Sequence, residues 1–165
     1  MKIGLLSDTH GCLDEQVFHH FKGCDQIWHA GDVGDVAIIK ALEDFKPVRA
    51  VHGNIDGLEV RQYCPENLHF TCKGLSIFLT HIANKPPIFT PRVRAIIEDK
   101  RPDVLVCGHT HILRVVKHQD LWYLNPGACG YTGFHTLRTL LRFDINDGKL
   151  MDMNVIELGP NRHDR

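Results

Sequence analysis

The stretch that decides the fold is Ile3-Gly4-Leu5-Leu6-Ser7, followed at once by Asp8-Thr9-His10. The apolar run predicts a short strand, and the turn after it carries a carboxylate and an imidazole two residues apart. Both groups are ligands that divalent metal ions take, and Gly11 lets the chain bend away. Taken alone, the segment is explained equally well by a helix-capping Asp8 and a surface His10.

The same arrangement recurs further along the chain. Three more segments follow apolar runs: Gly31-Asp32, Gly53-Asn54 and Gly108-His109-Thr110-His111, and His81 ends another run. Because ligands of open α/β sheets bind at the carboxyl ends of the strands, we expect these side chains to meet. The candidate metal ligands are Asp8, His10, Asp32, Asn54, His81, His109 and His111. This set is too large for one tetrahedral zinc ion and suits two cations that share a bridging carboxylate.

Two of these segments have common alternative explanations. Asp32 is our choice for the bridge, because each of its carboxylate oxygens can hold one metal. Its alternative role is a helix N-cap, which Asp35 supplies better. Asn54 can offer its amide oxygen, and Asp56 can orient a water molecule or neighbouring groups. A turn of Gly, Asn and Asp with nothing bound is nevertheless the commoner meaning of such a tetrapeptide.

The histidine positions differ in how specifically they indicate a metal site. His109 and His111 form the most specific pattern, because two imidazoles at i and i+2 after a buried strand can face two adjacent metals. Such pairs also occur by chance on surfaces, and a lone histidine such as His81 is usually structural. His52 is either a packed strand residue or a partner of the ligands. The other histidines in predicted helices, turns and tail are interpreted as structural: His19, His20, His118, His135 and His163.

Hydrophobic patterning predicts an α/β first half. We expect strands at residues 3–7, 26–29 and 47–51. Helices capped by Asp14 and Asp35 connect them, because aspartate at an N-cap accepts a hydrogen bond from the first helical turn. Two right-handed βαβ units follow from this order.

The pattern then changes to one in which strands pair locally. Residues 67–72 and 75–80 are separated by Lys73-Gly74, which predicts a hairpin and a mixed sheet. Thr90 and Pro91 predict the start of a helix that ends before Pro102. A strand at 103–107 follows.

The last third predicts a β meander over residues 112–117, 121–124, 139–144 and 150–156. The fold class is therefore α/β (α+β), with two mixed β-sheets packed as a sandwich and helices outside. We expect one domain over residues 1–159 and a frayed tail over 160–165, because 165 residues are ordinary for a single core.

Composition excludes several classes of partner. Lys plus Arg number 19 against 20 Asp plus Glu, with no basic stripe, so there is no strong nucleic-acid or membrane-surface signal. A small or locally charged substrate fits better. Six scattered cysteines without a Cys-x-x-Cys predict reduced thiols. No leader precedes the first strand and no run approaches the ~20 apolar residues of a membrane span, so we expect a cytoplasmic protein.

The order of these motifs resembles the signature of the calcineurin-like metallophosphoesterase superfamily. The motifs are Asp-x-His, Gly-Asp, Gly-Asn, a lone His and Gly-His-x-His. The similarity extends to about Ala128, and Asn125-Pro126-Gly127 resembles the small prokaryotic phosphodiesterases of the YfcE type. The resemblance implies a four-layer double β-sandwich and a binuclear metal centre. It assigns one metal to Asp8, His10, Asp32 and His111, and the other to Asp32, Asn54, His81 and His109.

The resemblance also implies an activity, that of a hydrolase. We expect a phosphodiesterase that hydrolyses a small phosphodiester by attack of a metal-bridging hydroxide. The implied catalytic residues are Asp32, Asn54, Asp56, His81 and His109. The imidazole-rich ligand set makes Mn²⁺ the first choice of metal, with Fe²⁺, Zn²⁺ or Ni²⁺ as alternatives to the oxygen-loving Mg²⁺.

One departure from the family pattern bears on the substrate. Protein phosphatases of the superfamily carry a histidine directly after the Gly-Asn pair, thought to protonate the leaving group, and this chain has Ile55 there. We therefore expect good leaving groups and diesters to be preferred. The alternative is a catalytically weak member of the fold that binds proteins as a scaffold, as the related retromer subunit does. That lineage is altered at the lone-histidine position, whereas His81 is present here. Small enzymes of this type often form homo-oligomers, an option for this chain too.

Overall fold

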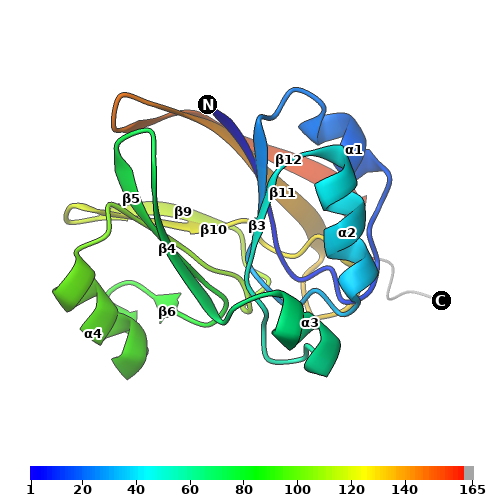
Figure 1. The fold of residues 1–165 in the computed structure, drawn as a ribbon, viewed down its shortest axis with the longest axis horizontal. Helices are drawn as coiled ribbons and strands as arrows, with labels where there is room; N and C mark the ends of the chain where they lie inside the picture. The colour runs from blue at the N-terminus through cyan, green and yellow to red at the C-terminus, as the bar shows by residue number, and fades with distance from the viewer. Residues whose placement is uncertain (162–165) are drawn as a thin grey trace.

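Two five-stranded sheets packed against each other, with helices on their outer faces, form the fold (Figure 1). The structure is a computed structural model, and it describes residues 1–161. The elements in chain order are β1 (Lys2–Leu6), α1 (Gln16–Phe21), β2 (Gln26–His29), α2 (Val36–Phe45), β3 (Val48–Ala50), α3 (Leu58–Tyr63), β4 (Asn67–Cys72), β5 (Leu75–Thr80), β6 (Asn84–Lys85), β7 (Ile88–Phe89), α4 (Pro91–Lys100), β8 (Val104–Val106), β9 (Arg114–His118), β10 (Leu121–Asn125), β11 (Leu137–Asn146) and β12 (Lys149–Pro160). The predicted two-sheet sandwich with flanking helices is confirmed.

The first sheet has the strand order β12-β11-β1-β2-β3. Strands β1, β2 and β3 are parallel, as the predicted βαβ units require, and β11 lies antiparallel to β1. Helices α1 and α2 cover the outer face of this sheet (Figure 1). Phe21 of α1 and Leu42 of α2 belong to one buried cluster with Ile27 of β2. Burial of these apolar side chains holds the helices to the sheet.

The second sheet has the order β4-β5-β8-β10-β9. Its three inner strands are parallel, and hairpins add one antiparallel strand at each edge. Helix α4 covers the outer face, where Val93 packs with Leu105 and Tyr123. Thr90 caps this helix by accepting a hydrogen bond from the Val93 N–H, as predicted, and Pro91 occupies its first turn.

The main core lies between the two sheets. Leu5 and Trp28 of the first sheet pack in one buried cluster with Leu79 and Val106 of the second. Strands β1 and β8 occupy the middle position of their respective sheets. The turns that follow these two central strands meet, because the backbone N–H of His109 donates to the Asp8 carboxylate at 3.2 Å. The sandwich thus brings two distant turns of the chain to one edge.

The predicted meander of the last third is wrong. Strands β9 and β10 form a hairpin in the second sheet, whereas β11 and β12 form a hairpin in the first. Strand β11 pairs with β1, which lies at the other end of the chain. Local alternation of apolar residues finds such strands, but it carries no information about which sheet they join.

Other predictions need smaller corrections. Asp35 caps α2 as predicted by accepting from the Ala37 N–H, but Asp14 lies one residue before the N-cap of α1. Helix α3 and the short β6–β7 pair were not predicted, because two to six residues give little periodic pattern. The predicted tail is partly ordered, since Pro160 belongs to β12 and the Asn161 N–H donates to the Thr136 carbonyl at 3.0 Å.

The rest of the predicted tail, residues 162–165 with His163, lies outside the described residues. Among the helices that the structure describes, none has the length and apolar character that crossing a membrane would require.

Candidate metal centre

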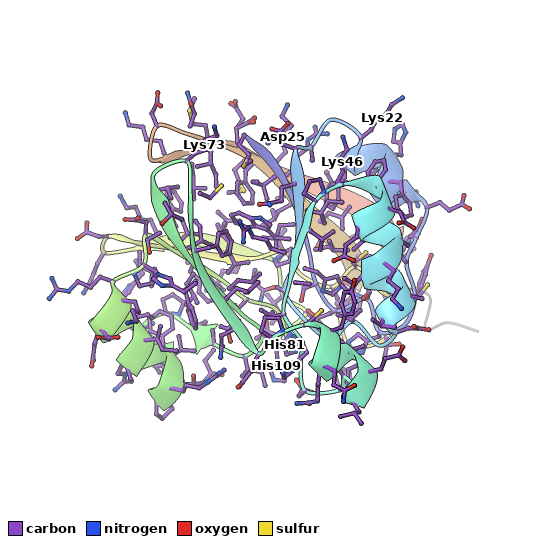
Figure 2. The ribbon with its side chains drawn as sticks, viewed as in Figure 1. Lys22, Asp25, Lys46, Lys73, His81 and His109 are labelled. Carbon is purple, nitrogen blue, oxygen red and sulfur yellow. The ribbon has the colours of Figure 1, made fainter. Side chains whose placement is uncertain are left out.

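All seven candidate ligands lie in the turns that follow β1, β2, β3, β5 and β8. Figure 2 shows His81 and His109 together at one edge of the sandwich, opposite the edge that carries Asp25 and Lys73. Their rings meet edge to face with centroids 5.3 Å apart. His81 follows β5 and His109 follows β8, so the carboxyl ends of two neighbouring strands bring these two candidate ligands together.

A first group of ligand atoms consists of Asp8, His10 and His111. The Nε2 atom of His111 lies 3.2 Å from Asp8 Oδ1 and 3.2 Å from His10 Nε2. The other carboxylate of the centre is close as well, because Asp32 Oδ2 lies 3.9 Å from His10 Nε2.

A second group consists of Asp32, His81 and His109. His81 Nε2 lies 3.2 Å from Asp32 Oδ1, while His81 Nδ1 donates to the Ala30 carbonyl at 2.7 Å. The two oxygens of Asp32 therefore face different groups, which is the arrangement expected of a bridge. Asn54 is exposed and lines the same pocket as Asp32 and His109.

The donor set fits two divalent cations. Asp8 Oδ1 and His81 Nε2 are buried and have no hydrogen-bond partner among the described residues. Leaving buried polar atoms unpaired costs about 1–3 kcal/mol each, and a cation would satisfy both. Ligand atoms about 2.1 Å from one cation, at angles of roughly 90–110°, lie about 3.0–3.4 Å apart. The separations of 3.2 Å around His111 Nε2 match this spacing.

Five of the seven candidate ligands have a left-handed backbone. Their φ angles are 57° at Asp8, 48° at His10, 53° at Asp32, 67° at His109 and 57° at His111. Residues other than glycine adopt this region rarely, and each instance costs about 1 kcal/mol or more. Such conformations persist at functional sites, where they aim side chains that a regular turn would point elsewhere. They explain how both i, i+2 pairs reach the centre.

Two motif glycines are required by close packing. A Cβ atom on Gly108 would overlap the Ser7 hydroxyl and lie 2.8 Å from Asp8 Oδ2. A Cβ atom on Gly53 would overlap Asp32 Oδ1. Only glycine lets these turns approach the two carboxylates so closely.

Asp56 lies beside the centre and outside both ligand groups. Its buried carboxylate accepts the backbone N–H groups of Val33 at 3.1 Å, Gly34 at 2.7 Å and Gly53 at 2.7 Å. These bonds join the turn of Asp32 to the turn of Asn54. The hydrogen bonds are compatible with the orientation of neighbouring groups that the sequence suggests for Asp56, and that role stays a prediction.

His29, which the sequence did not single out, joins two of the ligand turns. Its buried Nδ1 accepts from the Gly31 N–H at 3.2 Å, and its Nε2 lies 3.0 Å from Thr9 Oγ1. The Thr9 hydroxyl in turn donates to the Val33 carbonyl. Burial lowers the pKa of His29 to about 4, so the ring is neutral near neutral pH. Its place beside Gly31-Asp32 in the sequence is the only signal of this role.

His135 was interpreted as a structural loop residue, yet it contacts a candidate ligand. Its Nδ1 lies 3.3 Å from His111 Nδ1, and its Nε2 lies 3.0 Å from the Gly130 carbonyl oxygen. Nothing in the spacing of these two histidines, 24 residues apart, predicts the contact.

The metal-free centre favours an ionised Asp32 and neutral rings at His10 and His109, whereas it favours the charged form of His81. Burial raises the pKa of Asp32, but the charge of the neighbouring His81 and the hydrogen bond from the Ile55 N–H outweigh this effect, so the pKa is lowered. Burial lowers the pKa values of His10 and His109. Burial also lowers the pKa of His81, but Asp32 and Asp8 outweigh this and raise it. Metal ions bind the deprotonated forms of these side chains.

A family model for the calcineurin-like phosphoesterase superfamily domain matches residues 1–148. The chain belongs to this superfamily. A probable metallophosphoesterase of Methanothermobacter thermautotrophicus is 34% identical over 167 residues, covering 96% of this chain and 94% of the relative. A phosphodiesterase of Methanocaldococcus jannaschii is 27% identical, covering 85% and 92% of the two chains. Membership supports a metal-dependent hydrolase.

Solved structures share the fold of this superfamily member. An archaeal phosphodiesterase superposes with a TM-score of 0.77 at 24% identity, covering 96% of this chain and 100% of that one. Vps29 of Entamoeba histolytica complexed with Zn²⁺ gives a TM-score of 0.72 at 20% identity, with 95% and 99% coverage. At these identities the likeness confirms the two-sheet architecture and no more.

A pocket of about 420 Å³ opens over the centre of this superfamily member. Its walls include His10, Asp32 and His109, and its rim carries the exposed apolar side chains of Ile55 and Phe134. The volume suits a small substrate. The side chain after Asn54 is thus an isoleucine that faces the pocket rather than an acid or imidazole.

Proposed function

We propose that the chain is a metal-dependent phosphodiesterase that hydrolyses a small phosphodiester at this centre. The observation that carries the proposal is the pair of ligand groups around Asp32, each with a buried atom that lacks a partner. Asp8, His10, Asp32 and His111 would hold one cation. Asp32, Asn54, His81 and His109 would hold the other.

When bound, two cations would supply Lewis acidity toward phosphoryl oxygens and lower the pKa of coordinated water toward neutrality. The ligand set suits Mn²⁺ first, with Fe²⁺, Zn²⁺ or Ni²⁺ as alternatives. The protein contributes two carboxylates, from Asp8 and Asp32, so two divalent cations leave the centre positive toward a phosphate anion. The remaining ligands are neutral donors, which preserve this charge.

The protein's own groups orient the site. The Ala30 carbonyl accepts from His81 Nδ1 at 2.7 Å, which directs His81 Nε2 toward the two carboxylates. Asp56 holds the turns of Asp32 and Asn54 at a fixed separation through its bonds to Val33, Gly34 and Gly53. These contacts prepare the ligands before a cation arrives, which reduces the cost of binding.

Ile55 supports the choice of diesters with good leaving groups. It is half exposed and lines the pocket directly after Asn54, where it can donate no proton. An alkoxide leaving group departs slowly when no protein group donates a proton to it. An aryl oxide departs readily without that proton, because the pKa of the corresponding phenol is low. We therefore propose that aryl and similarly activated diesters are cleaved faster than simple alkyl monoesters.

A protein-binding scaffold is the second candidate function. It is supported by the structural likeness to Vps29 and by the apolar side chains of Ile55, Ile112 and Phe134 that surround the pocket. The presence of His81 favours hydrolysis instead, because the resemblance described above places an altered residue at this position in the scaffold lineage.

Metal content and hydrolysis measured on the same preparations test the proposal. We expect about two equivalents of metal in the wild type after Mn²⁺ loading and gel filtration, and hydrolysis of bis(p-nitrophenyl) phosphate. Asp32→Asn and His81→Ala should abolish the activity. His69→Ala is the matched control, because His69 is exposed on β4 and its side chain lies 2.9 Å from the Ser76 hydroxyl, away from the candidate ligands. A wild type that binds less than one equivalent and stays inert would overturn the proposal.

A further inference from the structure

We propose that His135 is a positioning residue of the metal centre, which fixes the tautomer of His111 so that its Nε2 lone pair faces Asp8 and His10. The inference rests on the proposed function in one respect, that His111 is a metal ligand. It adds to that function a residue from outside the ligand motifs, on the loop between β10 and β11.

Hydrogen bonds determine the tautomers of both rings. The Gly130 carbonyl can only accept, so His135 Nε2, 3.0 Å away, must carry a proton. A neutral imidazole has one N–H, which leaves His135 Nδ1 as an acceptor. The 3.3 Å contact between the two Nδ1 atoms then requires the proton to be on His111 Nδ1. His111 Nε2 is left with a lone pair, 3.2 Å from Asp8 Oδ1.

The second ligand group contains a parallel that supports this role. His81 donates its Nδ1–H to the Ala30 carbonyl, and its Nε2 faces the centre. Metal-binding histidines usually donate their second N–H to a carbonyl, a carboxylate or water, because this bond fixes the tautomer and orients the ring. His111 has the same requirement. His135 Nδ1 accepts the second N–H of His111, as the Ala30 carbonyl accepts the second N–H of His81.

The loop that carries His135 is anchored, so the acceptor is held in place. The Asn161 side chain donates to the carbonyls of Gly133 at 3.1 Å and His135 at 3.0 Å. Packing against His111 is tight, because a Cβ atom on Gly133 would overlap His111 Nδ1. The two imidazole rings meet edge to face, with centroids 5.1 Å apart. These contacts give His111 little freedom to turn away from His135.

Three substitutions at His135 separate the hydrogen bond from the space that the ring fills. His135→Asn places an amide oxygen near the position of Nδ1, so the acceptor for His111 is kept. His135→Gln reaches the position of Nε2 and keeps the donor to Gly130 while losing the acceptor. His135→Phe keeps the ring shape and loses both bonds. His118→Phe, at the end of β9, serves as the control for a histidine replaced elsewhere.

The first readout is the tautomer, measured by two-bond ¹H–¹⁵N NMR on the metal-free full-length chain. We expect the Nδ1–H form of His111 in the wild type and in His135→Asn, and a loss of that preference in His135→Gln and His135→Phe. This measurement needs no metal and no activity. A wild-type His111 in the Nε2–H form would overturn the proposal.

The second readout is metal affinity, measured by calorimetric titration with Mn²⁺. We expect the affinity of one of the two sites to fall roughly 10- to 100-fold in His135→Phe and His135→Gln, with recovery in His135→Asn. Equal affinities of His135→Phe and wild type would overturn the proposal even if the wild type is an active phosphodiesterase. A wild type that shows the Nδ1–H tautomer but binds no metal would instead overturn the proposed function.

Discussion

Asp56 is the residue at which a change of one atom is expected to have the largest effect. In Asp56→Asn the shape of the side chain is kept, but one carboxylate oxygen becomes an NH₂ group. With the amide oxygen at the Oδ2 position, the bonds from Val33 and Gly53 survive. The NH₂ group then faces the Gly34 N–H, which donates to Oδ1 at 2.7 Å in the wild type. Two donors would oppose each other in a buried site.

The magnitude follows from the three bonds. A hydrogen bond to a charged group contributes about 1.5–3 kcal/mol, and one between neutral groups about 0.5–1.5 kcal/mol. Losing one charged bond removes about 2 kcal/mol, and making the other two neutral removes about 1 kcal/mol each. The free energy of unfolding should therefore fall by about 4 kcal/mol, a large part of the 5–15 kcal/mol typical of a domain.

Urea unfolding in the presence of EDTA, followed by circular dichroism, measures this change without a contribution from metal binding. Asp35→Asn is the matched control, because Asp35 also accepts a backbone N–H but is exposed at a helix N-cap, where asparagine is equally good. We expect its unfolding free energy to stay within about 0.5 kcal/mol of wild type. A loss below 1 kcal/mol in Asp56→Asn, with an unchanged dependence on urea, would refute the reasoning.

Further predictions concern packing, proton transfer and pH. Gly108→Ala should abolish tight Mn²⁺ binding in a calorimetric titration because its methyl group would overlap Ser7, whereas Gly57→Ala, which has open space around it, should bind normally. Ile55→His should raise kcat/KM for alkyl phosphodiesters more than for bis(p-nitrophenyl) phosphate, and an unchanged ratio would contradict the role given to Ile55. Between pH 6.5 and about 4 the free energy of unfolding of the metal-free protein should fall by about 3 kcal/mol because of His29. In this range His29 becomes protonated in the unfolded chain, whereas its buried ring stays neutral in the folded protein. His29→Gln should flatten this part of the pH profile measured by urea unfolding.

The ligand turns could be predicted because each follows a strand whose apolar run is visible in the sequence. The strand ends that carry Asp8, Asp32 and His81 lie where the sequence places them, and the packing of the two sheets brings His81 Nε2 to 4.0 Å from Asp8 and 3.2 Å from Asp32. The pairing of β11 with β1 could not be predicted, because the two strands lie far apart in the sequence and local patterning does not specify which sheet a strand joins.

Supporting residues were harder to find than ligands. His29 and His135 bond across 20 and 24 residues to groups whose positions depend on the complete fold. A neutral buried histidine and a loop histidine have no sequence pattern of their own. The left-handed backbone at Asp8 and His10 was missed for a similar reason, since left-handed turns are usually recognised in a sequence by glycine or asparagine.

The left-handed ligand positions also have a consequence for the evolution of such chains. At each of these positions a glycine or asparagine would relax the backbone and stabilise the metal-free fold by up to about 1 kcal/mol, while removing or weakening a ligand. Selection for stability alone would therefore erode the centre before it erodes the sandwich. A chain freed from the need to bind metal can therefore lose side chains at these five positions and keep its sandwich.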